Sequence, residues 1–506
     1  MGGVDIAARS LPLNDDWVYA EPTRRLATGH GLHLFPEVAV PAIPQISLGA
    51  LAWVIHPSFT LLRLETLVLA ALTVVLVIAL SQGLGAGPFW SVLAGAALAT
   101  FPVFAGVSAS FMTEPMYLAL LLGAALVGTG WLRQGRRSPW LPALLLVAAL
   151  DRQHALGIPA ALSVGVLLLR ARRTRADLVF LAVCWLATIA GLAFPALTQL
   201  ATPRMAFRVS TAGHSTLQLL LPAFAYTPRL LGLLVAPFGL PLARAAWGGR
   251  PGRDVVAVSV VAGALALLSL LVPDGTRGTY LTVVGLGPVS LPGDKPQLLG
   301  AVLPVLKLLS VAAFTALVAA TYRRRRQLPL SPALAFLVVL ALTQAIPMLT
   351  FSVYDRYYLP VVAILLPVAA AVLREVAPRR ADVVAAMAVL LVLLGVFAAG
   401  EQDFIAWQAA RDALAHRVMA ATPSAVFFGG YETYGTYTLS PMFEAGHFAG
   451  PTGPDLPSFI GPPDPQVTLA IAGPGDPRPG LDYGSLAPGR VVLVCPRGPC
   501  PAVLGH

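Results

Sequence analysis

The chain has 506 residues, of which 57% are apolar and only 11% charged, and its mean hydropathy is +0.76. A soluble globular protein needs more polar surface than this composition supplies, so the solvent of this chain must largely be lipid. The net charge of +10 lies in short clusters between apolar runs, which argues against a nucleic-acid-binding face and indicates membrane topology.

The first chemical feature along the chain is a pair of adjacent carboxylates in Asn14-Asp15-Asp16-Trp17-Val18-Tyr19. Adjacent carboxylates repel, which raises the pKa of one of them unless a cation or metal lies beside them. Such a carboxylate can take a proton from an acceptor hydroxyl or amine, or bind a divalent ion through oxygen. The alternative is a helix N-cap at Asn14 or Asp15, with a helix running through Arg24. The local sequence favours neither interpretation.

Apolar runs then follow one another to residue 400. Runs of about 17 to 25 residues can cross a hydrocarbon core of about 30 Å as helices, because each residue rises about 1.5 Å. Nine runs meet this condition, at 59–81, 88–107, 114–132, 178–199, 254–273, 299–320, 331–350, 357–373 and 382–400. Three weaker runs lie at 139–150, 155–169 and 228–243. The first two of these flank Asp151 and Arg152, which would be costly at the bilayer centre, so short tilted helices are expected there.

The run at 114–132 begins with Thr113-Glu114-Pro115. Thr113 can cap this helix, Pro115 suits its first turn and Glu114 complements its dipole, so a structural role is sufficient. A functional role for Glu114 stays open.

Basic residues at the outer ends of other runs are candidates for binding a phosphate. Arg152 lies in Asp151-Arg152-Gln153-His154 and Arg356 in Tyr354-Asp355-Arg356-Tyr357-Tyr358. An arginine at the membrane interface can hold a phosphate with two hydrogen bonds. The alternative for Arg356 is an interfacial anchor among aromatic neighbours. The largest internal outer loop adds three weaker candidates, Arg204, Arg208 and His214.

The arginine clusters provide an independent test of topology, because cations near membrane segments are retained in the cytoplasm. All five clusters fall on one side if the twelve runs all cross the membrane: Arg133 to Arg137, Arg170 to Arg175, Arg244 to Arg253, Arg323 to Arg326, and Arg374 to Arg380. The opposite, extracytoplasmic side then receives 1–58, 108–113, 151–154, 200–227, 274–298, 352–356 and everything after 400. We therefore expect a multi-pass protein of the plasma or inner membrane.

The predicted topology requires the N-terminal segment to cross the membrane, and the sequence must explain how it does so. No signal peptide or apolar helix precedes the polar stretch Leu13 to Leu34, yet the arginine pattern places this stretch outside. Either the helix at 59–81 inserts in reverse orientation, or the start of the protein lies upstream and a first helix is missing.

The tail after residue 400 differs in composition, since 13 of the 45 prolines lie between 451 and 501 and preclude long helices there. Val467 to Ile471 and Arg490 to Val494 are predicted strands of a small α/β or irregular domain. Cys495 and Cys500 would face an oxidising compartment, so they form either a small disulfide loop or two free thiols. Three domains are expected: an outer segment at 1–58, an all-α bundle of about twelve transmembrane helices at 59–400, and an extracytoplasmic domain at 401–506.

Three motifs in order resemble one known class. They are Asp15-Asp16-x-x-Tyr19 with Ala20 and Gly29, then Thr113-Glu114-Pro115, then Arg356-Tyr357-x-Leu359-Pro360. Over about residues 13 to 373 the chain is similar to GT-C glycosyltransferases, closest to the protein O-mannosyltransferase and lipid A aminoarabinose transferase branch (glycosyltransferase family 39-like). This resemblance implies about thirteen helices, often with a soluble C-terminal domain. It also implies transfer of a sugar from a polyprenyl-phosphate carrier to a lipid, glycan or protein acceptor.

The resemblance also assigns roles by position. Asp15 corresponds to the principal catalytic carboxylate, Asp16 to a more variable acidic partner and Glu114 to a second acidic site. Arg356, with its neighbour Tyr357, and Arg152 would face the carrier phosphate, and Tyr19 belongs to the first motif. The chemistry agrees, because direct displacement needs a base for the acceptor and positive charge for the leaving group. Such a displacement inverts the anomeric carbon and needs no nucleotide.

Two alternatives concern the metal and the class of function. A divalent metal held by Asp15, Asp16 and Glu114 could neutralise the leaving group, or arginine alone could do so. The competing functions are a secondary transporter, another lipid-linked glycan ligase or flippase, and a non-catalytic assembly protein. Transporters usually place charges near mid-membrane and show repeated halves, whereas here the charges lie at one face and no repeat is found.

Overall fold

The computed structural model describes residues 13, 15–35, 38–168, 174–202, 227–271, 280–326, 331–346, 354–422, 427–441, 465–495 and 500. Among these residues, eight helical segments are long and apolar enough to cross a membrane. They are α4 (Phe59–Gly83), α7 (Thr113–Gln134), α10 (Arg175–Leu197), the segment Thr227–Trp247 that ends in α12 (Gly239–Trp247), α13 (Arg253–Leu268) with η4 (Ser269–Leu271), α14 (Val302–Arg323), η6 (Asp355–Tyr358) with α16 (Leu359–Val372), and α17 (Arg380–Ala421).

Further helices complete the bundle. The helices α5 (Pro88–Thr100) and α6 (Pro102–Ser108) make a ninth candidate span that bends by 64° at the break. Shorter apolar helices are α3 (Ile43–Ile55), α8 (Trp140–Asp151), η1 (Gln153–Leu156) with α9 (Gly157–Leu168), and α15 (Pro332–Ala345). Each of the twelve predicted runs therefore coincides with a helix or a bent pair, which confirms the predicted fold class. The helices on either side of Arg152 are short, as their charged junction requires.

The helix ends follow from local sequence. The Ser58 hydroxyl accepts a hydrogen bond from the Leu61 N–H at the start of α4, and Thr174 and Asp177 form a capping box at the start of α10. The helix α7 ends at Gly135, whose φ of 72° is accessible to glycine at little cost. The apolar side chains of these helices divide between an interior shared by the bundle and an outer surface suited to lipid. Leu186, for example, is 65% exposed, whereas Leu121 is fully buried.

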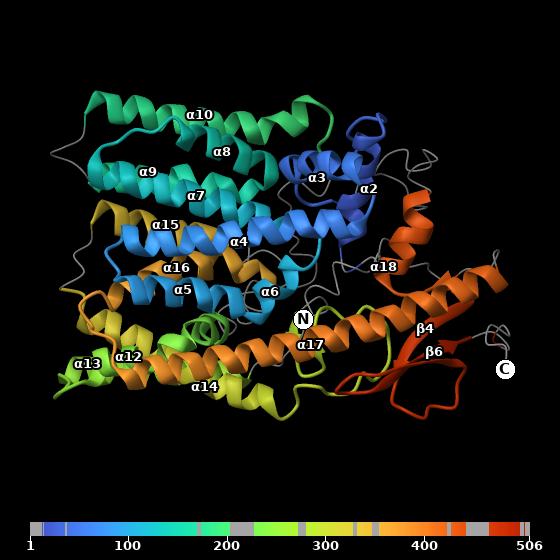
Figure 1. Cartoon of the computed structure of the whole chain (residues 1–506). Helices are drawn as coiled ribbons and strands as arrows, with labels where there is room; N and C mark the ends of the chain where they lie inside the picture. The colour runs from blue at the N-terminus through green and yellow to red at the C-terminus, as the bar shows by residue number, and fades with distance from the viewer. Residues whose placement is uncertain are drawn as a thin grey trace.

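The predicted basic clusters lie at one end of the bundle (Figure 1). Ion pairs connect the helix ends there: Arg137 Nε lies 2.9 Å from Asp177 Oδ1, and Arg244 Nη1 lies 2.7 Å from Asp382 Oδ2. Arg323 Nη1 donates to the carbonyl of Ala246 at 2.9 Å. Residues 169–173, which carry part of one cluster, lie outside the described residues. The assignment of this end to the cytoplasm stays a prediction.

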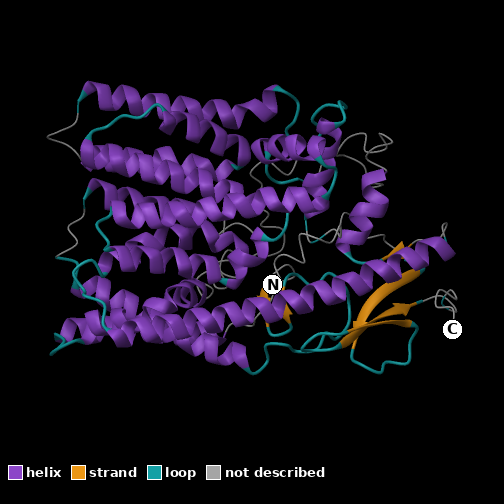
Figure 2. Cartoon of the chain, in the orientation of Figure 1, coloured by secondary structure: helices purple, strands orange, loops and turns teal. Residues whose placement is uncertain are grey.

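At the opposite end, the chain forms α2 (Asp16–Ala27), the hairpin β1 (Leu281–Thr282) and β2 (Gly285–Leu286), the short helix α18 (Tyr431–Tyr434) with the π-helix η7 (Gly435–Leu439), and a four-stranded sheet. The sheet order is β3 (Phe427–Phe428), β4 (Val467–Ala472), β6 (Gly489–Val494), β5 (Gly480–Tyr483). The strand β3 runs parallel to β4 and the other pairs are antiparallel, with Leu469 opposite Leu493. Figure 2 shows this sheet beside the far end of α17.

The two predicted strands of the tail correspond to β4 and β6, which confirms them. The shorter strands β3 and β5 were not predicted, because two to four residues carry too little alternation to identify. The helix α17 continues through Gly400, the predicted end of the bundle, and its outer residues Trp407 and Leu414 pack in one cluster with the sheet. Of the two alternatives for Cys495 and Cys500, the structure has the disulfide.

Candidate active site

Four segments far apart in the sequence bring two carboxylates and two arginines together at the end of the bundle opposite the basic clusters. Arg356 Nη2 donates to Asp15 Oδ2 at 2.9 Å, and Arg356 Nε lies 3.8 Å from Glu114 Oε1. Arg152 Nη2 lies 2.9 Å from the same Glu114 oxygen. Asp15 precedes α2, Glu114 begins α7, Arg152 joins α8 to η1 and Arg356 lies in η6. We call these four residues the charged cluster.

The charged cluster retains unused hydrogen-bonding capacity. Nε and Nη1 of Arg356, Nε of Arg152 and Oε2 of Glu114 are buried and make no hydrogen bond with the described residues. Buried donors without partners are costly, so they favour a ligand that supplies acceptors. Arginine donors in such a position suit the oxygens of a phosphate.

Asp15 occupies the position of a helix N-cap without acting as one. The predicted helix forms from Asp16 to Ala27, but the Asp15 side chain makes no capping hydrogen bond. It contacts Arg356 and also the hydroxyl of Tyr431, which reaches the site from α18. Burial and the nearby Asp15 charge raise the pKa of Tyr431, so its hydroxyl stays protonated and can donate. Asp15 is therefore at the N-cap position, as the alternative predicted, but its side chain does not cap the helix.

Asp16 faces away from the charged cluster. Its Oδ2 accepts hydrogen bonds from Arg63 Nε at 3.0 Å and Nη2 at 2.6 Å, and its Oδ1 accepts one from the Phe111 N–H at 2.7 Å. Both side chains are almost fully buried, at 0% and 1% exposure. Burial raises the pKa of Asp16, and the Arg63 guanidinium opposes this rise. These contacts fix α2 against α4 and against the loop before α7.

The start of α7 differs from its prediction. Met112 is at the N-cap position and no side chain caps the helix there. Thr113 instead accepts a hydrogen bond from Arg152 Nη2 through its hydroxyl. The predicted capping role of Thr113 is therefore wrong, because Arg152 from the α8–η1 junction takes its hydroxyl. Glu114 does lie in the first turn, where the helix dipole favours its charge.

Aromatic side chains border the charged cluster. The Arg356 guanidinium lies 5.5 Å from the ring centroids of both Tyr354 and Tyr357, and the Arg152 guanidinium lies 5.9 Å from that of Tyr117. Tyr19 is buried beside the cluster, and burial raises its pKa. Arg356 thus has the aromatic neighbours that its alternative predicted and is also a member of the cluster, whereas its position at the membrane interface stays a prediction.

The Asp355 carboxylate orients the segment that carries Arg356. It accepts hydrogen bonds from the N–H groups of Tyr280 and Leu281 at 2.8 to 2.9 Å and from the N–H of Arg356 at 2.8 Å. Three backbone donors on one carboxylate hold the β1 strand against η6. Asp355 is therefore bound to the backbone and does not face the cluster as a free base.

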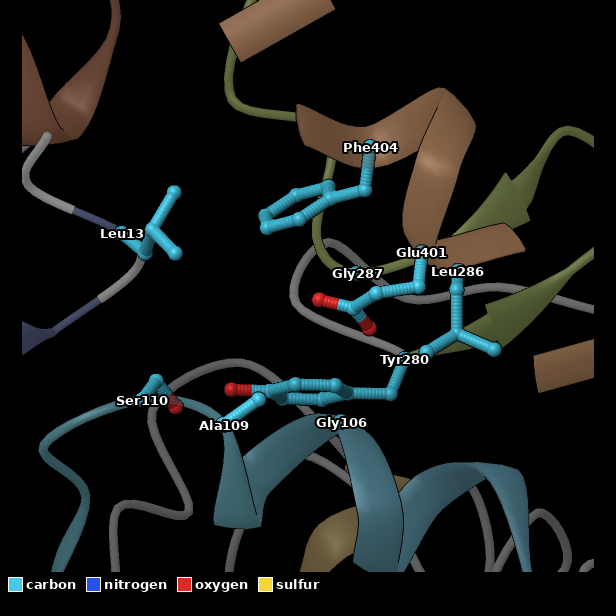
Figure 3. Close-up of a pocket in the computed structure, with 9 residues that line it drawn as sticks. All are labelled: Leu13, Gly106, Ala109, Ser110, Tyr280, Leu286, Gly287, Glu401 and Phe404. Carbon is cyan, nitrogen blue, oxygen red and sulfur yellow. The ribbon is translucent and has the colours of Figure 1, made fainter. Parts of the chain in front are cut away.

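A small cavity lies beside Tyr280, whose N–H donates to Asp355 (Figure 3). Leu13, Ser110, Tyr280, Glu401 and Phe404 are among the residues that line it. The Glu401 carboxylate points into the cavity between the Tyr280 and Phe404 rings (Figure 3). Glu401 is 3% exposed and makes no hydrogen bond or ion pair with the described residues, although the Arg63 charge acts on it.

The described part of the chain contains no group of three or more His, Cys, Asp or Glu side chains that could hold a metal ion. The three carboxylates considered as ligands do not converge, because Asp16 turns to Arg63 while Asp15 and Glu114 each pair with arginine. This arrangement does not fit a metal site, and arginine is the cation available at the cluster. The weaker candidates Arg204, Arg208 and His214 lie outside the described residues.

Comparisons with known proteins add a likeness in structure. No protein-family model matches the chain, and none of the curated proteins matches it. The crystal structure of ArnT from Cupriavidus metallidurans bound to undecaprenyl phosphate is similar over 97% of this chain and 95% of that one. The TM-score is 0.44 and the sequence identity is 14%. The functional argument therefore rests on the side chains of the site itself.

Sequence reasoning missed three contributors to the site: Arg63, Tyr431 and Tyr280. Arg63 had a usable signal, since an arginine inside an apolar run needs a partner. Tyr431 and Tyr280 had none, because they lie in short irregular segments and only the fold brings them to Asp15 and Asp355.

Proposed function

We propose that the chain is a glycosyltransferase that moves a sugar from a polyprenyl-phosphate donor to an acceptor at the extracytoplasmic membrane face. The observation that carries this proposal is the charged cluster at one end of an apolar helical bundle, with buried arginine donors that make no hydrogen bond with the described residues. A phosphate anchored in lipid would arrive at that end and meet those donors.

Asp15 is the base of the proposed reaction. Its side chain is 20% exposed, against 3% for Glu114 and 0% for Asp16. An acceptor hydroxyl can therefore reach Asp15 but not Asp16. Arg356 and the Tyr431 hydroxyl hold the Asp15 carboxylate in place, which a positioned base requires.

The leaving group is the lipid phosphate. The acceptor oxygen loses its proton to Asp15 and bonds to the anomeric carbon, while the bond from that carbon to the phosphate oxygen breaks. The phosphate departs with both electrons of that bond, and the Arg356 and Arg152 guanidinium groups stabilise its added charge. One displacement inverts the anomeric configuration. Glu114 holds the two arginines side by side.

An apolar cavity near Asp355 supports a lipid-linked donor. It has a volume of about 40 Å³, and its lining combines leucines with two cations, Arg229 and Lys307. Arg229 donates to the carbonyl of Ser269. The cavity is large enough for a few methyl or methylene groups, and its leucines with nearby cations suit contact with one part of a polyprenyl phosphate. Asp355 directly precedes Arg356 in the chain.

Substitution of Asp15 tests this function. In purified protein supplied with a polyprenyl-phosphate sugar, Asp15→Asn should lower the rate of transfer by about 10² to 10⁴, because the acceptor loses its base. Asp476→Asn is the matched control, since Asp476 is paired with Arg478 in the C-terminal sheet domain and should not affect transfer. Transfer by Asp15→Asn at the wild-type rate would overturn the mechanism. Movement of the lipid across the bilayer without transfer would instead indicate a flippase.

A further inference from the structure

A second cavity is lined in part by Trp17, which lies two positions after Asp15 in the chain. It has a volume of about 220 Å³ and is bordered by α2, by α3 and the start of α4, and by η7. The residues that give it its chemistry are Trp17, Glu21, Arg24, Trp53, Phe59 and Thr436. Pockets for drug-sized ligands measure about 300 to 1,000 Å³, so this cavity suits a smaller ligand such as one sugar ring.

The polar side of the cavity is one face of α2. Glu21 and Arg24 are three residues apart and form a two-bond ion pair, with Arg24 Nε on Glu21 Oε2 at 3.0 Å and Arg24 Nη2 on Glu21 Oε1 at 2.9 Å. Across the cavity, the hydroxyl of Thr436 is buried and makes no hydrogen bond with the described residues. The polar lining thus combines an ion pair without net charge and a threonine whose buried hydroxyl has no hydrogen-bond partner among the described residues.

The apolar side is aromatic. Trp53 and Phe59 are half-buried and line the cavity from the α3–α4 junction. Aromatic rings attract the polarised C–H groups on the apolar face of a pyranose, while polar groups bind its hydroxyls. The combination of aromatic rings with a neutral polar face is suited to an uncharged sugar and poorly suited to a phosphate or a uronate.

Two residues that line the cavity, Trp17 and Phe59, contact residues that hold Asp15 and Asp16 in place. Trp17 directly follows Asp16, and its indole lies 5.5 Å, centroid to centroid, from the ring of Tyr431, whose hydroxyl contacts Asp15. On the other side, the Arg63 guanidinium lies 5.4 Å from the Phe59 ring. A ligand in the cavity would therefore be held next to the segment that carries the proposed base.

We propose that this cavity binds one neutral pyranose ring of a glycan acceptor, beyond the sugar that reacts. Trp53 and Phe59 contact the apolar face of the ring, and Glu21, Arg24 and Thr436 bind its hydroxyls. Binding of a non-reacting unit supplies energy that positions the reacting hydroxyl at Asp15. The assignment of this ring to the acceptor rests on the proposed function, whereas the binding of a pyranose does not.

The test measures binding without catalysis. The full-length protein in lipid nanodiscs is titrated with methyl glucoside, galactoside, mannoside and N-acetylglucosaminide, with glucuronic acid and glucose 6-phosphate as charged comparators. Saturation-transfer NMR should detect at least one neutral glycoside. Trp53→Ala should weaken its binding about tenfold and Glu21→Gln severalfold, whereas Trp53→Phe should retain it. Trp140→Ala is the matched control, since Trp140 is 71% exposed at the start of α8.

Three outcomes would overturn the proposal: no glycoside binds the wild-type protein, Trp53→Ala binds it equally well, or the charged comparators bind more tightly. Phospholipids with brominated chains can also be added to quench the fluorescence of Trp53. If glycosides do not reduce this quenching, the cavity holds a lipid instead. Asp15→Asn separates the two proposals, because it should lower the rate of transfer by about 10² to 10⁴ and leave glycoside binding unchanged. If glycosides bind but Asp15→Asn transfers sugar at the wild-type rate, the proposed mechanism is refuted and the proposed pyranose site is not.

Discussion

The carboxylates at the end of the bundle that holds the charged cluster differ in their contacts, and these contacts limit what each carboxylate can do. Asp15 is held by Arg356 yet remains partly exposed, Asp16 is enclosed with Arg63, and Glu114 lies between two arginines. Glu401 has no hydrogen-bonding partner among the described residues. Of these four, only Asp15 combines an arginine contact with access for an acceptor.

The planar fork of Arg356 is expected to matter beyond its charge. Arg356→Lys keeps a cation but loses the directed Nε and Nη donors, so the rate of transfer should fall about 10²-fold. Arg325→Lys serves as the control, because Arg325 is exposed at the opposite end of the bundle. Steady-state transfer from a polyprenyl-phosphate sugar measures both variants. A wild-type rate in Arg356→Lys would show that a point charge is sufficient.

The Asp16–Arg63 pair should be required for stability. Asp16→Asn removes the carboxylate charge that pairs with the buried Arg63 guanidinium, and breaking a buried pair in this way costs about 3–5 kcal/mol. The melting temperature of the protein in detergent should therefore fall. Glu401→Gln is the contrasting variant, since it replaces a buried carboxylate that makes no hydrogen bond with the described residues. Its melting temperature should stay equal or rise, and an equal loss in both variants would contradict this account.

At the scale of elements, the site is assembled at helix termini. The starts of α2, α7 and α16 and the short junction after α8 each contribute one charged residue. The sequence predicted these positions well, because charges interrupting apolar runs must lie near the membrane surface. It did not predict the break between α5 and α6 at Pro102, which lets the loop ending at Phe111 approach Asp16.

The contact of η7 with α2 should control the position of Asp15. Gly435 lies directly against the Trp17 indole, and a Cβ at this position would overlap with the ring. Gly435→Ala should therefore displace η7 or α2 and lower both the transfer rate and the melting temperature. Gly395→Ala is the matched control, because no heavy atom lies within 4 Å of where its Cβ would be. Wild-type behaviour of Gly435→Ala would show that the two elements move independently.

At the scale of the whole molecule, the basic helix ends and the charged cluster lie at opposite ends of the bundle (Figure 1). The C-terminal sheet lies at the end with the charged cluster and packs along the outer part of α17. The C-terminal segment also supplies Tyr431 to Asp15. The tail is thus part of the candidate active site and not only an appendage.

The predicted orientation can be measured in intact cells. In a Cys184→Ser background, Gly475→Cys in the C-terminal sheet domain should react with a membrane-impermeant maleimide from outside. Gly135→Cys, at the end of α7 beside the arginine cluster, should react only after permeabilisation. The reverse pattern would place the charged cluster in the cytoplasm and contradict the proposed extracytoplasmic reaction.

The sequence by itself determined the membrane bundle, the separation of basic from acidic ends, and the identity of Asp15, Glu114, Arg152 and Arg356 as site candidates. Apolar run length and charge position are local properties, so they can be read without a fold. Only the tertiary structure decided the pairings. Asp16 meets Arg63 across 47 positions and Asp15 meets Arg356 across 341, because helix packing and rotation, which no local pattern encodes, bring these side chains into contact.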